Sequence, residues 1–362
     1  MASFTFDETG LFNRATGVAT MALRIRDREH RFGAVAALSV CAALGLAGCG
    51  SGVANLLPGA TQPAAGVPSG PVLGYVFSPV DGTLRAMMGV RGSSQVSTSI
   101  VPAGVYVAGE ASTASNTGLL EDSAGTLFAF NLPLSQPLHV VDGLPAHVQI
   151  SFSASGKTAI AYAAGGSSIA LISGLPGSPQ VKMVAVPSGA TALSAVVSDG
   201  GTIALAVQGT PVQVGTLSAG GQFSALTSVV AVGGMNFLPG SEDLLVADGG
   251  ANSAAVIRSV SAGASKQALS VAGLNSPVAI AGSQDKRWAV IADGGDGGVF
   301  RVDLVNGTPA TKLTCACQPT LLSSLAGGGT FRLNSLYGGP VWTVDLTSAA
   351  PQLLFVPAIT KQ

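Results

Sequence analysis

The segments GGVFRVDL (297–304) and GPVWTVDL (339–346) share one pattern, a Gly or Pro turn followed by alternating apolar residues. Alternation places every second side chain on the same face of a β-strand. Five related segments precede them: GTLRAM, GTLFAF, SSIALI, TPVQVG and SAAVIRSV. The anchoring aliphatic residues of the seven copies lie 43, 42, 43, 44, 43 and 42 residues apart: Leu84, Leu127, Ile169, Val212, Val256, Val299 and Val341. Such a constant spacing indicates a repeat architecture.

Each copy is accompanied by further strand-like segments. A second strand that ends in a tight turn precedes it, as in LLVADGGANS (244–253) and VIADGGDGG (290–298). A third strand comes before this hairpin, for example HVQISFS (147–153), and a fourth follows it, for example VKMVAV (181–186). Four strands in roughly 43 residues match one blade of a β-propeller. We therefore predict an all-β propeller with seven four-stranded blades; six or eight blades are the alternatives, because the first repeat looks incomplete.

The two ends of the repeat array are expected to differ from its middle. The first repeat begins directly with VLGYVFS (72–78), so we expect it to lack its innermost strand. We also expect a strand from one terminus to complete the blade of the other and so close the ring. An array of β-sandwiches is the alternative architecture, but it would not require so constant a step.

Composition favours this fold and argues against one class of partner. Among the 362 residues are 49 Gly and 20 Pro, and 10% of residues are charged, far below the roughly 25% typical of soluble domains. The net charge is -1 without a basic stripe, so we expect no nucleic-acid partner. Aromatic residues are only 5%, which favours a packed stack of aliphatic repeats over an aromatic-lined cavity.

Several turns carry a family resemblance. SASGK (153–157), SDGG (198–201) and the two ADGG turns at 247–250 and 292–295 are similar to turns of the YVTN, NHL and WD-repeat propellers. The resemblance covers most of 70–358, although the strict WD and YVTN motifs are absent, and it implies the fold. The C-terminal stretch from Cys315 also resembles uncharacterised propeller lipoproteins of environmental bacteria, a likeness that implies no activity.

The N-terminal region has the layout of an export signal. Arg24, Arg26, Arg28 and Arg31 precede the uncharged stretch FGAVAALSVCAALGLAG (32–48). This stretch is shorter than the roughly 20 residues of a spanning helix, and no basic stop-transfer cluster follows it. We expect residues 1–48 to be a signal peptide whose true start is Met21; a retained membrane anchor is the alternative.

The sequence Leu46-Ala47-Gly48-Cys49 resembles the lipobox of bacterial lipoproteins. The resemblance implies that Cys49 is lipidated and that cleavage occurs before it, so acylated Cys49 would hold the protein in a lipid bilayer at the cell envelope. The residue after the cysteine is Gly50 and not Asp. By the resemblance to lipoproteins, this implies that the protein is sorted to the outer membrane if the organism is Gram-negative. Residues 49–70, rich in Gly, Ala, Pro and Ser, are expected to form a flexible tether to a domain over 71–358. An ordinary signal peptide with an incidental cysteine is the alternative.

Cys315 and Cys317 form a C-x-C motif with three interpretations. They form a local disulfide, remain two inert thiols, or supply half of a metal or redox site. A disulfide over so small a loop removes little chain entropy, so it would fix a turn more than stabilise the fold. A zinc site needs four ligands, and the only other candidates, His139 and His147, are far away in sequence.

No residues are predicted to be catalytic or to bind a metal. His139 and His147 flank a turn and are interpreted as strand or loop histidines. The DGGDGG segment (293–298) has the glycine-spaced acids of a calcium loop but lacks its further oxygen ligands and terminal Glu. Aspartate before glycine is also common in hairpin turns. Calcium is therefore the one cofactor considered, and none is predicted.

Two functions remain open. In the first, the tethered propeller is a binding or assembly scaffold whose loops contact another envelope protein, a peptide or a glycan. In the second, it is a lactonase-like or lyase-like propeller enzyme with a metal in the central channel. The scarcity of histidine and the lack of a convergent carboxylate set favour the scaffold.

The lipobox generates the first prediction. Replacing the predicted lipid-bearing residue, Cys49→Ser, should abolish incorporation of labelled fatty acid and leave the precursor uncleaved, because both steps require the thiol. Metabolic labelling with palmitate and the mass of the intact protein measure the two outcomes. Cys41→Ser, in the same apolar stretch, is the matched control and should be processed normally. Unchanged labelling of Cys49→Ser would contradict the lipobox interpretation.

Overall fold

The alternating aliphatic segments form β-strands. The computed structural model describes residues 70–101, 106–133 and 137–357, and each regular element in these ranges is a strand. No helix within them is long and apolar enough to cross a membrane. The predicted signal peptide (1–48) and residues 49–69 of the predicted tether lie outside the described residues.

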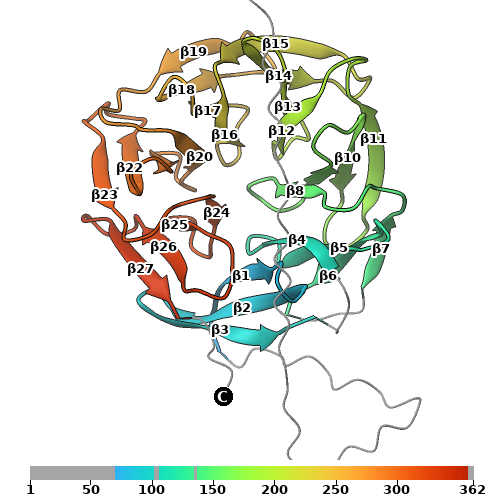
Figure 1. Cartoon of the computed structure of the whole chain (residues 1–362), viewed down its shortest axis with the longest axis horizontal. Coiled ribbons are helices and arrows are strands. Elements are labelled where there is room, and N and C mark those ends of the chain that lie inside the picture. The colour runs from blue at the N-terminus through green and yellow to red at the C-terminus, as the bar shows by residue number, and fades with distance from the viewer. Residues whose placement is uncertain (1–69, 102–105, 134–136, 358–362) are drawn as a thin grey trace, which may run out of the picture. The chain divides into compact units, whose positions relative to one another are not determined.

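The described strands form seven antiparallel sheets, each from a continuous part of the chain, arranged as a ring (Figure 1). In chain order they are β1 (Val72–Ser78), β2 (Thr83–Val90) and β3 (Ser93–Ser99); β4 (Tyr106–Ser112), β5 (Thr117–Asp122), β6 (Leu127–Asn131) and β7 (Leu138–Val141); β8 (Gln149–Phe152), β9 (Ala159–Tyr162), β10 (Ser168–Ser173) and β11 (Gln180–Ala185); β12 (Ala192–Val197), β13 (Ile203–Val207), β14 (Val212–Leu217) and β15 (Phe223–Val229); β16 (Val232–Phe237), β17 (Leu244–Asp248), β18 (Ser253–Arg258) and β19 (Ser265–Ala268); β20 (Pro277–Gly282), β21 (Trp288–Asp293), β22 (Gly298–Asp303) and β23 (Thr311–Thr314); and β24 (Ser323–Ser324), β25 (Thr330–Arg332), β26 (Val341–Asp345) and β27 (Gln352–Val356).

Burial changes from strand to strand across a blade. The second strands β13 and β17 are buried along their whole length, whereas the outermost strand β19 is exposed along its whole length. Strands covered on both faces are expected to read as continuous apolar runs. This explains why IALAV and LLVAD lack the apolar–polar alternation of a half-exposed strand.

Each sheet packs face to face against the next one around the ring. Seven buried clusters occur in the described residues, and each draws its side chains from two neighbouring sheets. Val214 of β14 and Leu244 of β17, for example, belong to one cluster. Val, Leu, Ile and Ala dominate these clusters, as the composition suggested. The predicted seven-bladed propeller is confirmed.

Among the described residues the first sheet has three strands, and the strand missing there is the outermost, which corrects the expectation of a missing innermost strand. Pairing of β1 with β2 is irregular between Val72 and Gly74, and four complete blades have the same irregularity between their first two strands. Figure 1 also shows β1 beside the channel and β3 at the periphery. The misassignment arose because Leu84 lies in a second strand, whereas the other six anchoring residues lie in third strands.

The part of the chain that the structure describes closes the ring without the expected exchange of a strand between the termini. In the described residues, the first sheet contains only β1 to β3 and the last only β24 to β27. The two sheets meet through a buried cluster that includes Leu73 and Met87 from the first and Val341 and Val356 from the last. A single main-chain bond, from the Ala326 N–H to the Leu73 carbonyl at 2.8 Å, joins their inner edges.

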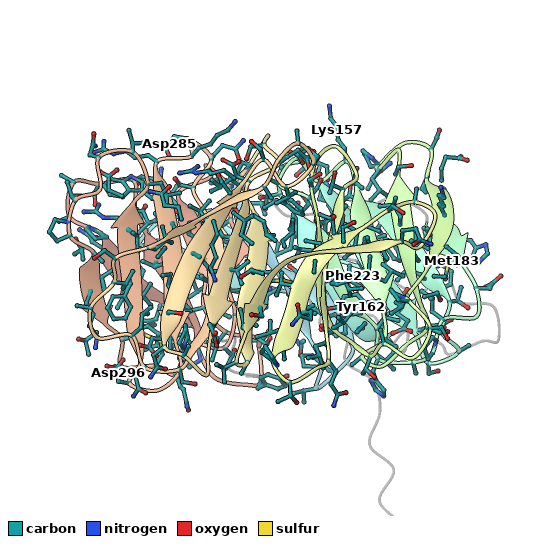
Figure 2. The ribbon with its side chains drawn as sticks, turned by 90° about the horizontal axis from the view of Figure 1, so that it is seen from above. Lys157, Tyr162, Met183, Phe223, Asp285 and Asp296 are labelled. Carbon is teal, nitrogen blue, oxygen red and sulfur yellow. A yellow bond between two sulfur atoms is a disulfide. The ribbon has the colours of Figure 1, made fainter. Side chains whose placement is uncertain are left out.

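Hydrogen bonds also link the turns between first and second strands of neighbouring blades. Lys157 and Asp285 come from such turns and lie on one face of the ring, whereas Asp296 lies on the opposite face (Figure 2). Asp199, in the turn after β12, accepts the Ser155 N–H at 2.7 Å and the Gly240 N–H at 3.0 Å. One carboxylate thereby joins three successive blades.

This position changes the acidity of Asp199. Burial alone would raise the pKa of the carboxyl group. Hydrogen bonds from Ser155, Ser153 and Gly240 outweigh burial, and the pKa lies below its usual value. The ionised form of Asp199 therefore stabilises the fold. That contribution is complete above the unfolded-state pKa and is lost as the pH falls through the folded-state pKa.

We expect Asp199→Asn to lower the free energy of unfolding by about 1–3 kcal/mol near pH 7, because charge-assisted bonds to two neighbouring turns are lost. The difference from the wild type should begin to shrink below about pH 4, where the Asp199 carboxyl of the unfolded chain protonates, and should keep falling as the pH approaches the lower folded-state pKa. Denaturant unfolding at pH 7 and pH 3.5 measures both effects. Asp142→Asn is the control, since that side chain is 72% exposed. An equal loss at both pH values would contradict the assignment.

Candidate functional site

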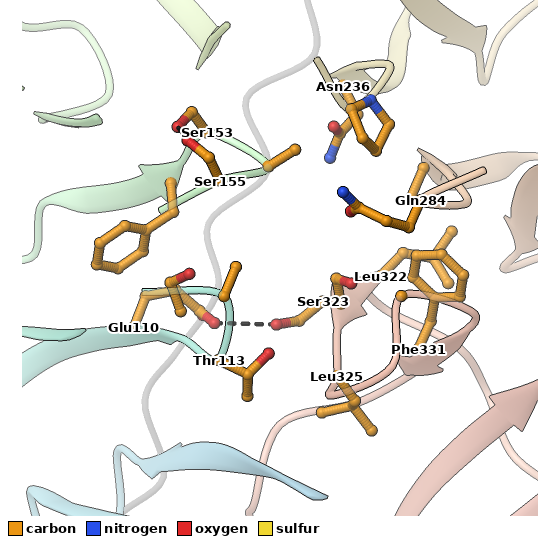
Figure 3. A pocket seen from close by; sticks show the side chains of 18 of the residues that line it. Glu110, Thr113, Ser153, Ser155, Asn236, Gln284, Leu322, Ser323, Leu325 and Phe331 are labelled. Carbon is orange, nitrogen blue, oxygen red and sulfur yellow. Dashed lines mark hydrogen bonds between the residues drawn. The ribbon is translucent and has the colours of Figure 1, made fainter. Parts of the chain in front are cut away.

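The channel opens, on the face of Lys157 and Asp285, into a cavity of about 780 Å³ (Figure 3). Its walls come from the innermost strands of several blades and the turns that follow them. This volume lies within the range of small-molecule sites. Because the walls belong to hydrogen-bonded strands of different blades, the side chains they carry are held at fixed positions.

A charged pair lies at one side of this mouth. Glu110 of β4 accepts a hydrogen bond from the Ser323 hydroxyl at 3.0 Å, drawn dashed in Figure 3. Its other oxygen lies 3.4 Å from a guanidinium nitrogen of Arg332 in β25. Arg332 also donates to the Asn334 carbonyl at 3.0 Å. The ion pair thus joins the second and seventh blades across the three-stranded first blade.

Burial makes this pair asymmetric. The Arg332 side chain is 3% exposed, whereas that of Glu110 is 27% exposed and lines the cavity. Among the described residues, the Arg332 Nε finds no hydrogen-bond acceptor. Arg332 therefore depends on Glu110 for its countercharge, and in turn its charge compensates that of Glu110 at the channel mouth.

Most other polar groups at the mouth are uncharged. Hydroxyl and amide side chains from four blades surround the opening in Figure 3, namely Thr113, Ser153, Ser155, Asn236 and Gln284. Apolar side chains, including Leu322, Leu325 and Phe331, line another part of the cavity. Lys157 is the second charged residue in the lining, besides Glu110. This mixture suits a ligand that has both neutral hydrogen-bonding groups and apolar surface.

The sequence-predicted residues lie outside this mouth or outside the described residues. Cys49 and the lipobox residues Leu46, Ala47 and Gly48 belong to the latter group. Cys315 and Cys317 are joined by a disulfide between β23 and β24, where the Cys315 N–H donates to the Gly297 carbonyl. Neither cysteine lines the cavity.

The two histidines do not converge on a site. His139 Nε2 lies 2.9 Å from Asp142, and both side chains are more than half exposed. His147 has a positive φ of 68°, and its backbone N–H, together with that of Val148, donates to Glu121. Burial raises the pKa of Glu121 in spite of these bonds. Glu121 therefore holds the chain between the second and third blades, and His147 contributes its backbone.

The acids of 293–298 are bonded to the chain itself. Asp293 accepts the N–H groups of Asn275 and Gly295, and Asp296 accepts that of Gly298 and pairs with Lys312. Across the described residues, no group of three or more His, Cys, Asp or Glu side chains is placed to hold a metal. The prediction that no cofactor is bound stays untested.

Glu110, Arg332 and the neutral polar residues of the mouth were not predicted from the sequence. Glu110 lies in YVAGEAS (106–112), where a carboxylate interrupts a strand of small residues two positions before its end. A lone charge in an innermost strand, in a chain so poor in charge, was the available signal. Its partner Arg332 lies 222 residues further along the chain, and no feature of the sequence around it suggested a site.

Solved structures resemble this ring, although comparisons with family models and with curated proteins give no significant match. Virginiamycin B lyase from Staphylococcus aureus is 14% identical, with a TM-score of 0.54, over 71% of this chain and 85% of the lyase. The ring is a β-propeller. A functionally unknown protein from Desulfotomaculum acetoxidans is 13% identical, with a TM-score of 0.54, over 80% of this chain and all of that chain. At these identities the likeness shows the fold alone.

Removing the countercharge at the propeller's channel mouth should destabilise the fold. We expect Glu110→Gln to lower the free energy of unfolding by about 2 kcal/mol, because Arg332 is left buried and unpaired. The double variant Glu110→Gln/Arg332→Met should recover part of that loss. Lys157→Gln removes the other charge of the lining and should change stability by less than about 0.5 kcal/mol. Chemical unfolding measures all three, and a Glu110→Gln protein as stable as the wild type would refute the pairing.

Proposed function

We propose that this protein is an exported lipoprotein, anchored through Cys49, whose propeller binds a neutral glycan at the channel mouth. The cavity lined by uncharged hydroxyl and amide groups beside apolar side chains carries the proposal. Saccharides present both hydroxyl groups and apolar C–H surface, so they match such a lining. The anchoring part of the proposal rests on the N-terminal sequence.

The charges at the mouth favour a neutral ligand over an ionic one. The Glu110 carboxylate is already paired with Arg332 and Ser323, so it offers a cation little uncompensated charge. Lys157 is exposed in its turn, where solvent screens its charge. A peptide segment, the other ligand class with neutral hydrogen-bonding groups, is the competing outcome of the test below.

The alternative is a propeller enzyme of the hydrolase or lyase type. It draws support from the likeness to virginiamycin B lyase, of which a histidine-to-alanine variant is described as catalytically inactive. In the part of this chain that the structure describes, neither His139 nor His147 lines the channel cavity. A ligand-binding role needs only the groups observed at the mouth, so it is the better supported function.

A screen of neutral glycans and neutral peptides against the full-length acylated protein in detergent tests the proposal. We expect a neutral glycan to bind. Asn236→Ala and Gln284→Ala should each weaken its affinity about tenfold, which corresponds to the loss of one hydrogen bond. Isothermal titration calorimetry measures the affinities. Gln267→Ala is the matched control, because it removes an amide from the exposed outer strand β19.

Two outcomes would overturn the proposal. Binding of peptides but of no glycan would show that the channel mouth binds a different class of ligand. A stoichiometric divalent metal in the purified protein, measured by elemental analysis and accompanied by turnover of a bound ligand, would favour the enzyme.

A further inference from the structure

A second cavity of about 800 Å³ lies between the sixth and seventh blades. Its walls come from β21, β22 and the turns at 283–287, 327–329 and 346–349. It shares Gln284, Gly327 and Gly328 with the lining of the channel cavity, so the two lie side by side. Asp285, on the upper face in Figure 2, belongs to this second cavity alone.

Two arginines contact the same tryptophan in this cavity. The guanidinium carbons of Arg287 and Arg301 lie 4.5 Å and 4.3 Å from the ring centroid of Trp288. An indole attracts cations through its π face and holds a guanidinium in a defined plane. The stack therefore fixes two positive charges, each with a planar set of N–H donors, at the wall of the cavity.

The donors of Arg301 are poorly used within the protein. Its Nε is buried and has no hydrogen-bond acceptor among the described residues. Its Nη1 reaches the Ala349 carbonyl only at 3.5 Å, which is long for such a bond. A buried donor without an acceptor costs roughly 1–3 kcal/mol. A ligand in the cavity would bond to the terminal N–H groups of Arg301, since the covered Nε lies out of its reach.

The nearby carboxylates compensate the arginines only in part. Asp303 pairs with Arg287 at 3.4 Å but accepts shorter bonds from the Val305 and Asn306 N–H groups. Asp285 accepts the Arg287 backbone N–H and the Ser283 hydroxyl. Both acids thus hold turns in place. Their presence nevertheless limits the positive charge of the cavity, which favours a singly charged anion over a dianion.

Glycines 327–329 form another part of the cavity lining. Gly327 and Gly328 have positive φ values of 88° and 65°, which side-chain-bearing residues rarely adopt. A Cβ atom on Gly329 would lie 2.8 Å from a methyl group of Thr347, and one on Gly328 would lie 2.3 Å from Gln284. The 327–329 backbone is therefore packed closely without filling the space beside Trp288.

We propose that this cavity binds a carboxylate-bearing sugar, a uronate, through Arg301 and Arg287. The planar carboxylate would accept N–H groups from the terminal nitrogens of the Arg301 guanidinium. Arg287, which also stacks on Trp288, would add a second positive charge. The hydroxyl groups of the sugar would face Gln284, Ser348 and the glycine backbone. This site shares Gln284 and the 327–328 backbone with the neutral-glycan site, but the two arginines line only this second cavity.

Tryptophan fluorescence of the full-length acylated protein tests the proposal. The chain has two tryptophans, Trp288 and Trp342, so a Trp342→Phe background reports on Trp288 alone. We expect sodium glucuronate to give a saturable change in emission, at constant ionic strength, that glucose does not give. Inorganic phosphate should bind more weakly than glucuronate because its second charge meets Asp285.

Variants of the two arginines then identify the donors. Arg301→Lys keeps the charge but loses the planar pair of donors, so we expect its affinity for glucuronate to fall about tenfold. Arg287→Gln should cause a smaller loss. Arg258→Gln, which removes an arginine from another blade, is the matched control and should bind as the wild type does. Thermal unfolding verifies that each variant is folded.

Three results would overturn the proposal: no saturable change with glucuronate, equal binding of glucose, or an Arg301→Lys protein with wild-type affinity. Tighter binding of phosphate than of glucuronate would refute the ligand class. Asn236 lines the channel cavity but not this one. Asn236→Ala should therefore leave glucuronate binding unchanged, so that failure of this proposal and failure of the neutral-glycan proposal can be told apart.

Discussion

Face-to-face packing between neighbouring sheets is the interaction on which the whole ring depends. Each blade is apolar on both faces and can bury them only against the blade before it and the blade after it. Seven buried clusters, made mainly of aliphatic side chains, do this in the described residues. The cluster that includes Leu73 and Val341 joins the first sheet to the seventh. The closed ring of packed sheets fixes where each innermost strand lies. It therefore also fixes the positions of the channel, its mouth and the turns around the mouth.

The repeat was predictable because its physical cause is local. Third strands such as β22 and β26 pair with neighbours on both sides, so their apolar residues recur at a constant step that the sequence displays. The ends of the array were not predictable in the same way. GTLRAM fits the step as well as the six true third strands do, yet Leu84 lies in β2. Its position is determined by the pairing of β1 with β2 and by packing against the seventh blade. Neither interaction produces a periodic pattern in the sequence.

The candidate sites could not be predicted from the sequence for a related reason. Glu110 and Arg332 are 222 residues apart and meet only because the ring closes. Arg301 was visible only as a polar residue that alternates with apolar ones in VFRVDL. In the structure Arg287 pairs with Asp303, and Arg301 lies against Trp288. Alternation predicted which face of the strand Arg301 occupies. Its neighbours on that face come from the packing of two blades.

The absence of strand exchange in the described part of the ring has a mechanical consequence. The described part of the ring begins at β1, at the inner edge of the three-stranded blade. There the seam with the seventh blade relies on side chains and one main-chain bond between inner edges. Pulling from this end would peel the first blade strand by strand instead of shearing a complete sheet. A protein tethered in this way would yield first at its point of attachment, while the six four-stranded blades remained paired.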